Sequence, residues 1–194
     1  NISAKTSQYA GDGISKLNVN KTTTPIVWMT AAESFFLRAE GALRGWAMGG
    51  SAQSFYEAGI KMSFLENNVS GAASYIADNT ATPAAYTDNT GDGNDAAAPS
   101  TITIAWDDAA GFEANLERII TQKWLHEGIL QSREAWSDIR RTGYPSGLNF
   151  PEVNGTIANV PNRWRYPTTE MNYNPYYKEV QDEDTYYTKL FWAK

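Results

Sequence analysis

The stretch that most constrains the fold is residues 121–145, TQKWLHEGILQSREAWSDIRRTGYP, which combines a helical pattern with a clear stop. Its side chains recur at steps of three and four, the spacing that places residues on one face of an α-helix. The predicted face comprises Leu125, Ile129, Ser132, Trp136 and Ile139. The sequence TGYP at 142–145 then ends the helix, because glycine suits a left-handed C-cap and proline cannot continue a helix.

Helical spacing also covers residues 26–46 and 52–66, and a further helix runs from about residue 109 into the stretch described above. Gly49 and Gly50 separate the first two helices. A short glycine turn between two helices predicts an antiparallel hairpin of the tetratricopeptide-like kind. One such pair cannot bury both of its faces, so we expect it to pack on the other helices.

Three segments lack sustained periodicity. Residues 1–25 are mostly polar and predict an extended lead-in. Residues 67–101 are rich in Ala, Thr, Asn, Asp, Gly and Pro and predict a long loop, which at this length is usually functional or disordered. Residues 145–194 are punctuated by prolines and predict an irregular tail, anchored to the helices by its many aromatic side chains. We therefore expect a single α-helical domain over residues 1–194 with long irregular segments.

Composition excludes several classes of protein. The net charge of -6 and the absence of a basic run longer than Arg140-Arg141 argue against nucleic-acid binding, which depends on clustered Lys and Arg. No stretch approaches the roughly 20 apolar residues that a membrane-spanning helix needs. The chain has no cysteine, which excludes disulfides, thiolate nucleophiles and thiolate metal ligands.

No catalytic constellation stands out from the sequence. His126 is the only histidine, which excludes a multi-histidine metal site, and we expect it to be structural or solvated. Glycoside hydrolysis needs two carboxylates across a cleft, and the context marks out no pair among the 22 acidic residues. No cofactor is predicted, because no glycine loop of the phosphate-binding type is present.

One segment partly matches a cation-binding loop. Asp88, Thr90, Asp92 and Gly93 have the spacing of the first half of a calcium loop, in which alternating oxygen side chains surround a hard cation. The match fails at Pro99, where such a loop needs a bidentate glutamate. We predict no metal site, with Asp88 and Asp92 as the candidates if an ion binds.

Four motifs follow one another along the chain. They are PIVWMTAAESFFLRAEGALRG at 25–45, QKW at 122–124 followed by AWSDIRRTGYP at 135–145, RWRYP at 163–167 followed by Glu170 and Asn174, and KLFW at 189–192. In wording and order they resemble the SusD/RagB family of outer-membrane nutrient-binding lipoproteins, specifically its SusD-like branch. The resemblance extends from Pro25 almost to the end of the chain.

The resemblance implies an all-α fold of tetratricopeptide-like helix pairs with long irregular loops and an irregular, aromatic-rich C-terminal tail. It also implies non-catalytic binding of a glycan or other oligomeric nutrient at the bacterial outer-membrane surface. The nutrient would then pass to a SusC-type TonB-dependent transporter. Family members are longer and begin with a lipidated cysteine, so the chain resembles the C-terminal part of such a protein. Contact with the membrane is expected only through a lipid anchor absent from this chain.

The residues themselves leave two alternatives open: a glycan-active enzyme that uses a carboxylate pair, and a purely structural helical scaffold. Ligand contacts in the family come from variable loops and aromatic side chains, so its shared motifs name no ligand-binding residue here. We expect Trp136 in the core, and Arg140 or Arg141 bonded to carbonyl groups of the tail. The candidates for stacking on a sugar are Tyr75, Tyr86, Tyr173, Tyr176 and Tyr177.

Overall fold

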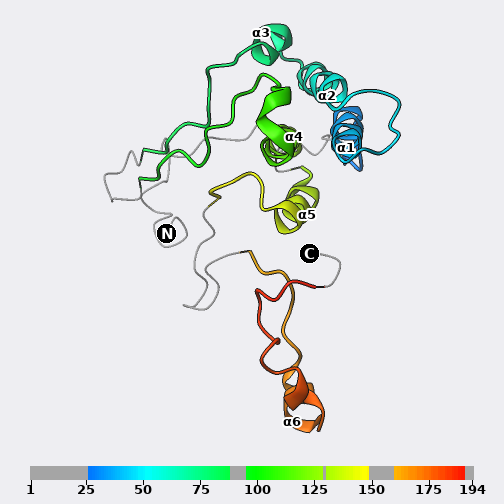
Figure 1. Ribbon diagram of the computed structural model, residues 1–194, viewed down its shortest axis with the longest axis vertical. Coiled ribbons are helices and arrows are strands. Elements are labelled where there is room, and N and C mark those ends of the chain that lie inside the picture. The colour runs from blue at the N-terminus through cyan, green and yellow to red at the C-terminus, as the bar shows by residue number, and fades with distance from the viewer. Residues whose placement is uncertain (1–25, 88–94, 129, 149–159, 191–194) are drawn as a thin grey trace. The chain divides into compact units, whose positions relative to one another are not determined.

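The computed structural model describes residues 26–87, 95–128, 130–148 and 160–190 of the chain. Its regular elements, which Figure 1 shows, are α1 (Ala31–Leu43), α2 (Ala52–Glu66), α3 (Ala72–Ile76), the 3-10 helix η2 (Asp108–Ala110), α4 (Gly111–Glu127), α5 (Ser132–Thr142), α6 (Thr168–Tyr173) and the 3-10 helix η3 (Tyr177–Glu179). The described residues contain no strand, which confirms the predicted all-α fold. No helix in this part of the chain is long and apolar enough to cross a membrane.

The chain divides into two compact units. Unit 1 comprises the described residues up to Trp136 together with Tyr144–Leu148. Unit 2 comprises Ser137–Gly143 together with the described residues from 160 to 190. The single domain over residues 1–194 and the packing of the tail on the helices stay predictions. The predicted lead-in, residues 1–25, lies outside the described residues.

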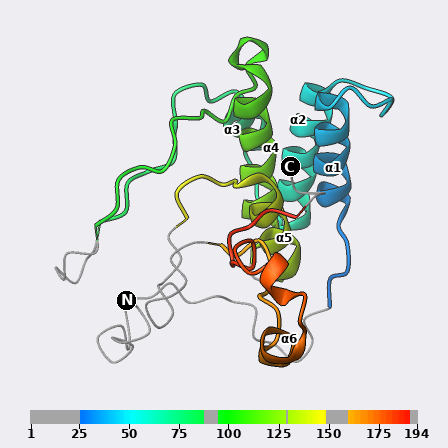
Figure 2. The same ribbon diagram turned by 60° about the horizontal axis from the view of Figure 1, so that its bottom comes forward.

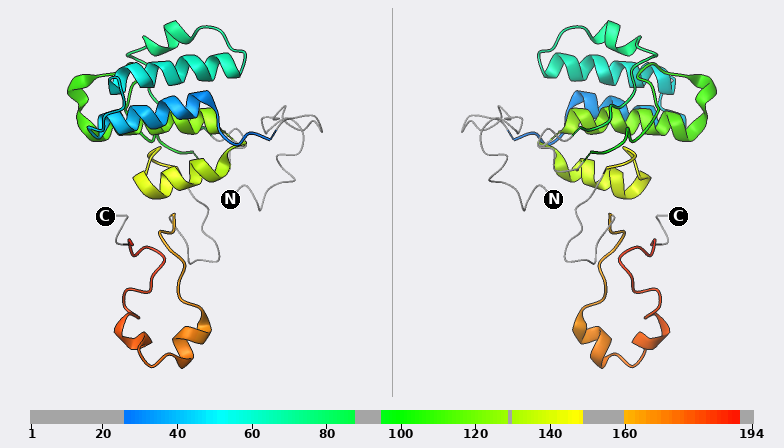
Figure 3. Two further views of the ribbon diagram at one scale, coloured as in Figure 1. Left: turned by 90° about the vertical axis from the view of Figure 1, so that its right-hand side faces the viewer. Right: turned by 90° about the vertical axis from the view of Figure 1, so that its left-hand side faces the viewer.

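Helices α1 and α2 form the predicted hairpin and lie side by side in Figure 3. The helix expected over residues 26–46 is shorter, because the side chain of Thr30 caps α1 by accepting a hydrogen bond from the Glu33 N–H at 3.0 Å. The second helix has the predicted bounds, and Ser51 caps it in the same way. The two helices approach closely at Gly59, where an added Cβ would lie 2.7 Å from the Phe36 ring. Glycine is therefore required at this crossing point.

The core of unit 1 lies where α1, α2 and α4 meet, and these three helices lie together in Figures 1 and 2. Its buried residues are Ala32, Phe36, Ala39, Phe55, Tyr56, Ile60 and Ile119. The Tyr56 hydroxyl donates a hydrogen bond of 2.7 Å to the Ile104 carbonyl, which fastens the segment before α4 to this core.

The periodicity of the stretch 121–145 predicted one continuous helix before the TGYP stop. The structure instead has two helices there. Gly128 has a φ of +48°, a left-handed conformation that ends α4, and α5 begins only at Ser132. The break changes which side chains share a face. Leu125 and Trp136 are exposed, so the prediction that Trp136 lies in the core is wrong. Ile139 is buried as expected.

The predicted loop at 67–101 contains the short helix α3 and an isolated antiparallel bridge between Tyr86 and Ala96. In Figures 1 and 2 the two arms that meet at this bridge run side by side away from the helices. The segment is thus more ordered than a plain loop. Its hydrogen-bonded pair holds the two arms together at 2.9 and 3.0 Å.

Unit 2 contains most of the tail that was predicted to be irregular. The prediction is wrong for residues 168–173 and 177–179, which form α6 and η3. Two extended arms lead to and from these short helices and lie side by side in Figure 3. The Asn162 N–H donates to the Tyr186 carbonyl at 2.7 Å, which pairs the arms. Proline at 167 precedes α6, where its missing N–H costs no helical hydrogen bond.

Candidate functional site

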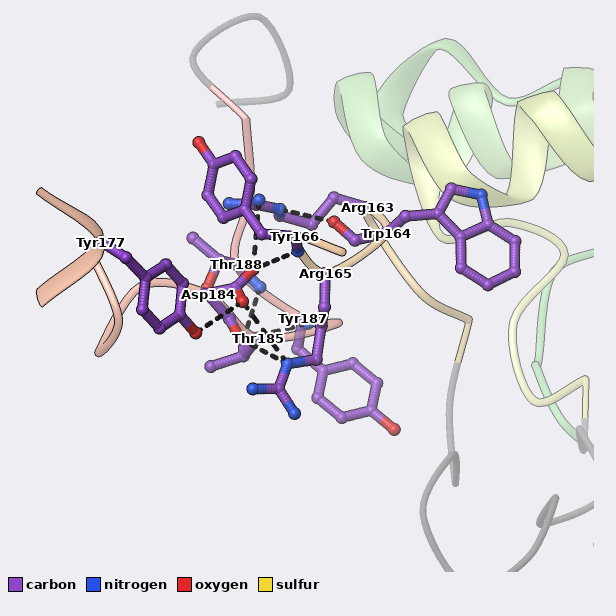
Figure 4. Close-up of polar contacts among 9 residues, drawn as sticks. All are labelled: Arg163, Trp164, Arg165, Tyr166, Tyr177, Asp184, Thr185, Tyr187 and Thr188. Carbon is purple, nitrogen blue, oxygen red and sulfur yellow. Dashed lines mark hydrogen bonds and ion pairs between the residues drawn. The ribbon is translucent and has the colours of Figure 1, made fainter. Parts of the chain in front are cut away.

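Unit 2 is organised around the carboxylate of Asp184, which is only 2% exposed (Figure 4). The Tyr166 N–H donates to Oδ1 and the Tyr177 hydroxyl donates to Oδ2, both at 3.0 Å. Two guanidinium groups complete the cluster, with Arg163 Nη2 3.3 Å from Oδ1 and Arg165 Nε 3.6 Å from Oδ2. A single buried carboxylate therefore ties both arms of unit 2 to the segment that carries η3.

Burial by itself raises the pKa of the Asp184 carboxyl. The hydrogen bonds from Tyr166 and Tyr177 and the positive charges of Arg163 and Arg165 outweigh this effect, so the pKa lies below its ordinary value. Asp184 is consequently a charged structural group at neutral pH.

The arms are fixed further by the amide of Asn162 and by Arg140. The Asn162 side chain donates to the Tyr187 carbonyl at 2.7 Å. Arg140 donates to the carbonyl oxygens of Pro161 at 3.0 Å and Asn162 at 2.5 Å. This confirms that Arg140 bonds to carbonyl groups of the tail. Arg141 instead pairs with Asp138 at 2.8 Å.

Three aromatic side chains of unit 2 lie largely in solvent. Trp164 and Tyr173 are 83% exposed and Tyr176 is 69% exposed. In Figure 4 the Trp164 indole points away from Asp184, although the backbone on both sides of it is held by Arg163 and Arg165. Large rings on a held backbone offer apolar faces that a ligand can cover without reordering the chain. We call Trp164, Tyr173 and Tyr176 the exposed rings of unit 2.

The five predicted stacking residues differ in exposure and in their contacts. Tyr173 and Tyr176 are exposed, as sugar stacking requires. Tyr177 is half-buried and its hydroxyl is bonded to Asp184. Tyr75 and Tyr86 lie in unit 1, where Tyr75 is half-buried against Phe64 and its hydroxyl contacts Gln122, while Tyr86 is exposed at its bridge with Ala96.

Sequence reasoning missed Trp164 as a candidate and Asp184 as the group that orders unit 2. Trp164 stands inside the RWRYP motif, and the shared motifs were not expected to name a ligand-binding residue. Its indole is nevertheless 83% exposed. No local pattern marks Asp184, because its partners at 163 to 166 lie far from it in the sequence.

His126 has a structural position in unit 1. Its Nε2 lies 2.8 Å from Thr30 Oγ1 and 3.4 Å from Glu66 Oε2, and its Nδ1 lies 2.9 Å from Ser63 Oγ. Burial lowers the pKa of the imidazole below its ordinary value of 6.5, against the opposing charge of Glu66. The ring therefore links α1, α2 and α4 in its neutral form.

The predicted cation candidates, Asp88 and Asp92, lie outside the described residues. Among the described residues, no group of three or more His, Asp and Glu side chains is placed to hold a metal ion.

Comparison with known proteins matches the chain to one family. A family model described as SusD-like, Susd and RagB outer membrane lipoprotein, matches residues 1–193. No curated protein matches the chain.

Solved structures of SusD homologues resemble the chain closely. One from Bacteroides thetaiotaomicron VPI-5482 has 39% identity and a TM-score of 0.72 over 89% of this chain and 40% of that one. A chitin-binding homologue from Flavobacterium johnsoniae has 45% identity and a TM-score of 0.69 over 86% of this chain and 36% of that one. A homologue from Bacteroides uniformis ATCC 8492 has 37% identity and a TM-score of 0.72 over 90% and 38%. The chain thus spans between 36% and 40% of the length of these relatives.

Proposed function

We infer the function from one premise: this chain belongs to the SusD-like family of SusD and RagB outer-membrane lipoproteins. We propose that it contributes to non-catalytic binding of a glycan or other oligomeric nutrient at the surface of the bacterial outer membrane. The relatives are longer than this chain, so the proposal concerns the binding protein as a whole.

The observation that carries the proposal is the set of exposed rings of unit 2 on a backbone held by Asp184. An aromatic ring binds the apolar C–H face of a pyranose through dispersion and burial of apolar surface. Because the arms are already ordered by charge-assisted hydrogen bonds, binding would not have to order them. This arrangement supports the capture of a sugar chain by stacking.

The first ligand class to test is a chitin oligosaccharide. A relative with 45% identity is a chitin-binding SusD homologue, and its match covers 86% of this chain. The acetamide methyl and the ring C–H groups of chitin add apolar surface to each sugar unit. Chitin is therefore a suitable ligand for exposed tryptophan and tyrosine side chains.

The family also suggests a partner and a location. We propose that the bound nutrient is passed to a SusC-type TonB-dependent transporter, and that a lipid anchor outside this chain holds the protein at the cell surface. Co-purification of a TonB-dependent transporter with the full-length protein from outer membranes tests the partnership. Recovery of the protein without any transporter would contradict it.

Calorimetric titration of the full-length protein with chitin, starch, mannan and peptide oligomers tests the binding function. We expect a chitin oligomer to bind, and Trp164→Ala to weaken that binding by about tenfold or more, as for a central aromatic contact. Trp28→Ala removes an indole of unit 1 that is 90% exposed; it is the matched control and should leave the affinity unchanged.

Two results would overturn the proposal. One is that no oligomer binds, or that alanine at Trp164, Tyr173 and Tyr176 together has no effect on binding. The other is release of reducing ends from a polysaccharide, lost on substitution of a single carboxylate, which would make the protein an enzyme.

A further inference from the structure

The guanidinium group of Arg165 is held in unit 2 through only one of its nitrogen atoms. Its Nε donates a hydrogen bond of 2.9 Å to the Asp184 carbonyl and lies 3.6 Å from Asp184 Oδ2. Its two Nη groups have no partner among the described residues, and no dashed contact reaches them in Figure 4. The side chain is 44% exposed, so a ligand can reach the guanidinium group.

The other guanidinium group of the cluster, that of Arg163, is much more enclosed. Its side chain is 16% exposed, and its Nη2 lies 3.3 Å from Asp184 Oδ1. Its Nε donates to the Trp164 carbonyl at 3.0 Å, and the group lies over the Tyr166 ring, 4.9 Å from the ring centre. Two positive charges therefore share one carboxylate, and Arg165 carries the more accessible of the two.

The bond at Nε also sets the direction of the Arg165 donors. A guanidinium group is planar, so an Nε held at the Asp184 carbonyl restricts where the two Nη groups point. A ligand that bonds to them would not have to order the whole side chain, which lowers the cost of binding. The group has N–H donors and no acceptor, so the ligand must supply an acceptor oxygen.

Charge narrows the choice of acceptor. Residues 160–190 contain four basic and five acidic residues, a net charge of -1, so a polyanionic chain gains no general attraction to this part of unit 2. A protonated amine cannot accept a hydrogen bond and is repelled by a neighbouring guanidinium group. A neutral carbonyl oxygen meets both conditions. In a sugar chain, the acetamide of an N-acetylated unit supplies such an oxygen.

The position of Arg165 next to Trp164 brings it within reach of a stacked sugar chain. Consecutive Cα atoms are about 3.8 Å apart, which is less than the length of one sugar unit. In Figure 4 the Trp164 indole and the Arg165 guanidinium leave the arm in different directions. An oligomer that crosses this arm can thus stack one unit on the indole and present an acetamide to Arg165.

We propose that Arg165 is a specificity-determining residue for N-acetylated sugars. Its Nη groups donate hydrogen bonds to the acetamide carbonyl oxygen, and they favour this group over a hydroxyl or a free amine at the same position of the sugar. The inference rests on the proposed glycan-binding function and extends it, because stacking on aromatic rings does not by itself read the substituent of the sugar.

Calorimetry on the full-length protein tests the proposal with two hexamers: chitohexaose, and cellohexaose, which has a hydroxyl in place of each acetamide. We expect chitohexaose to bind at least about tenfold more tightly, as for a hydrogen bond to a charged donor. Arg165→Met keeps an unbranched stem and removes the donors, so it should reduce this preference by about tenfold. Trp164→Ala should weaken both hexamers to a similar extent and keep the preference.

The matched control is Lys61→Met, which removes an exposed positive charge from unit 1 and should leave both affinities unchanged. Limited proteolysis of residues 160–190 shows whether Arg165→Met keeps unit 2 folded. If it does not, modification of the unaltered protein by phenylglyoxal decides, because this reagent reacts with accessible guanidinium groups. Saturating chitohexaose should slow the modification of Arg165, located by peptide mapping, and saturating cellohexaose should slow it much less.

Three results would overturn this inference: equal affinity for the two hexamers, an unchanged preference in folded Arg165→Met, or equal modification of Arg165 with either hexamer. Tighter binding of oligogalacturonate than of chitohexaose would also overturn it, because the site would then select a carboxylate. If chitohexaose binds and Trp164→Ala weakens it while the preference does not depend on Arg165, only this inference fails. If no hexamer binds, the proposed glycan-binding function fails with it.

Discussion

The two units of this chain are ordered by different physical means. Unit 1 has a core of apolar side chains from α1, α2 and α4, among them Phe36, Ile60 and Ile119. In residues 160–190 of unit 2, the one buried residue is Asp184, a charged group. Unit 1 therefore depends on the area of apolar surface removed from water, and unit 2 on hydrogen bonds and charge pairs around one carboxylate.

This difference affects what each unit can do. A well-packed apolar core is sensitive to a change in the volume of a single side chain. An arm held by a polar cluster needs few of its own rings for a core, so those rings remain available to a ligand. The exposure of Trp164, Tyr173 and Tyr176 in unit 2 follows from this arrangement.

The largest expected effect is a cavity in the core of unit 1. Phe36→Ala removes a ring that is 1% exposed, and it should lower the free energy of unfolding of unit 1 by about 3–5 kcal/mol. Urea denaturation followed by circular dichroism measures the loss. Leu37→Ala, an adjacent but exposed position, should cost much less. Equal losses for the two variants would contradict the assigned core.

Overpacking at the crossing of α1 and α2 should have the next largest effect. Gly59→Ala places a methyl group within 2.7 Å of the Phe36 ring and should destabilise unit 1 by about 1–3 kcal/mol. Urea denaturation of Gly59→Ala, Phe36→Leu and the double variant forms a cycle. The smaller leucine should make room, so the double variant should lose less than the sum of the single changes. Simple additivity would show that the two residues do not touch.

Removal of the negative charge of Asp184 should increase local unfolding of unit 2 and leave unit 1 unaffected. Asp184→Asn keeps the shape of the side chain but leaves Arg163 and Arg165 without their shared negative partner. We expect limited proteolysis within residues 160–190 to become about tenfold faster, because cleavage follows the population of the opened form. The thermal unfolding of unit 1 should not change.

The matched control for this experiment is Asp182→Asn, which changes an exposed carboxylate two residues away. It should leave the rate of proteolysis unchanged. If both variants are cleaved at the parental rate, the Asp184 cluster does not order the arms.

Mild acid should produce the smallest change in stability, and it should affect unit 1 but not unit 2. Burial lowers the pKa of His126 below 6.5, so as the pH falls through 6.5 the unfolded chain binds a proton more readily than the folded chain, and unit 1 loses stability. The pKa of Asp184 lies below its ordinary value of 3.8, so its contribution is present above that pH and is lost only in stronger acid.

Urea denaturation at pH 7, 6 and 5 tests this separation, with proteolysis of residues 160–190 as the parallel measure for unit 2. His126→Gln should make the stability of unit 1 less dependent on pH, while proteolysis of unit 2 should stay constant over the same range. An unchanged pH dependence in the variant would show that another group titrates.

Local signals in the sequence predicted much of the helical structure. The helical spacing of residues 52–66 predicted the bounds of α2, and the Gly49-Gly50 turn predicted the hairpin that α2 forms with α1. These features depend on residues within one or two turns of each other. The SusD-like motifs added the fold class, which the described residues confirm.

The sequence by itself determined the family, the helix pair and the presence of many aromatic side chains, because motif order, helical period and composition are properties of the chain. Tertiary structure alone decided which rings are exposed and which are buried. Gly128 ends α4, a conformation that periodicity does not reveal, and Trp136 is consequently exposed. Asp184 gathers partners from 163, 165, 166 and 177. Such contacts join residues distant in sequence, so they arise only when the chain has folded.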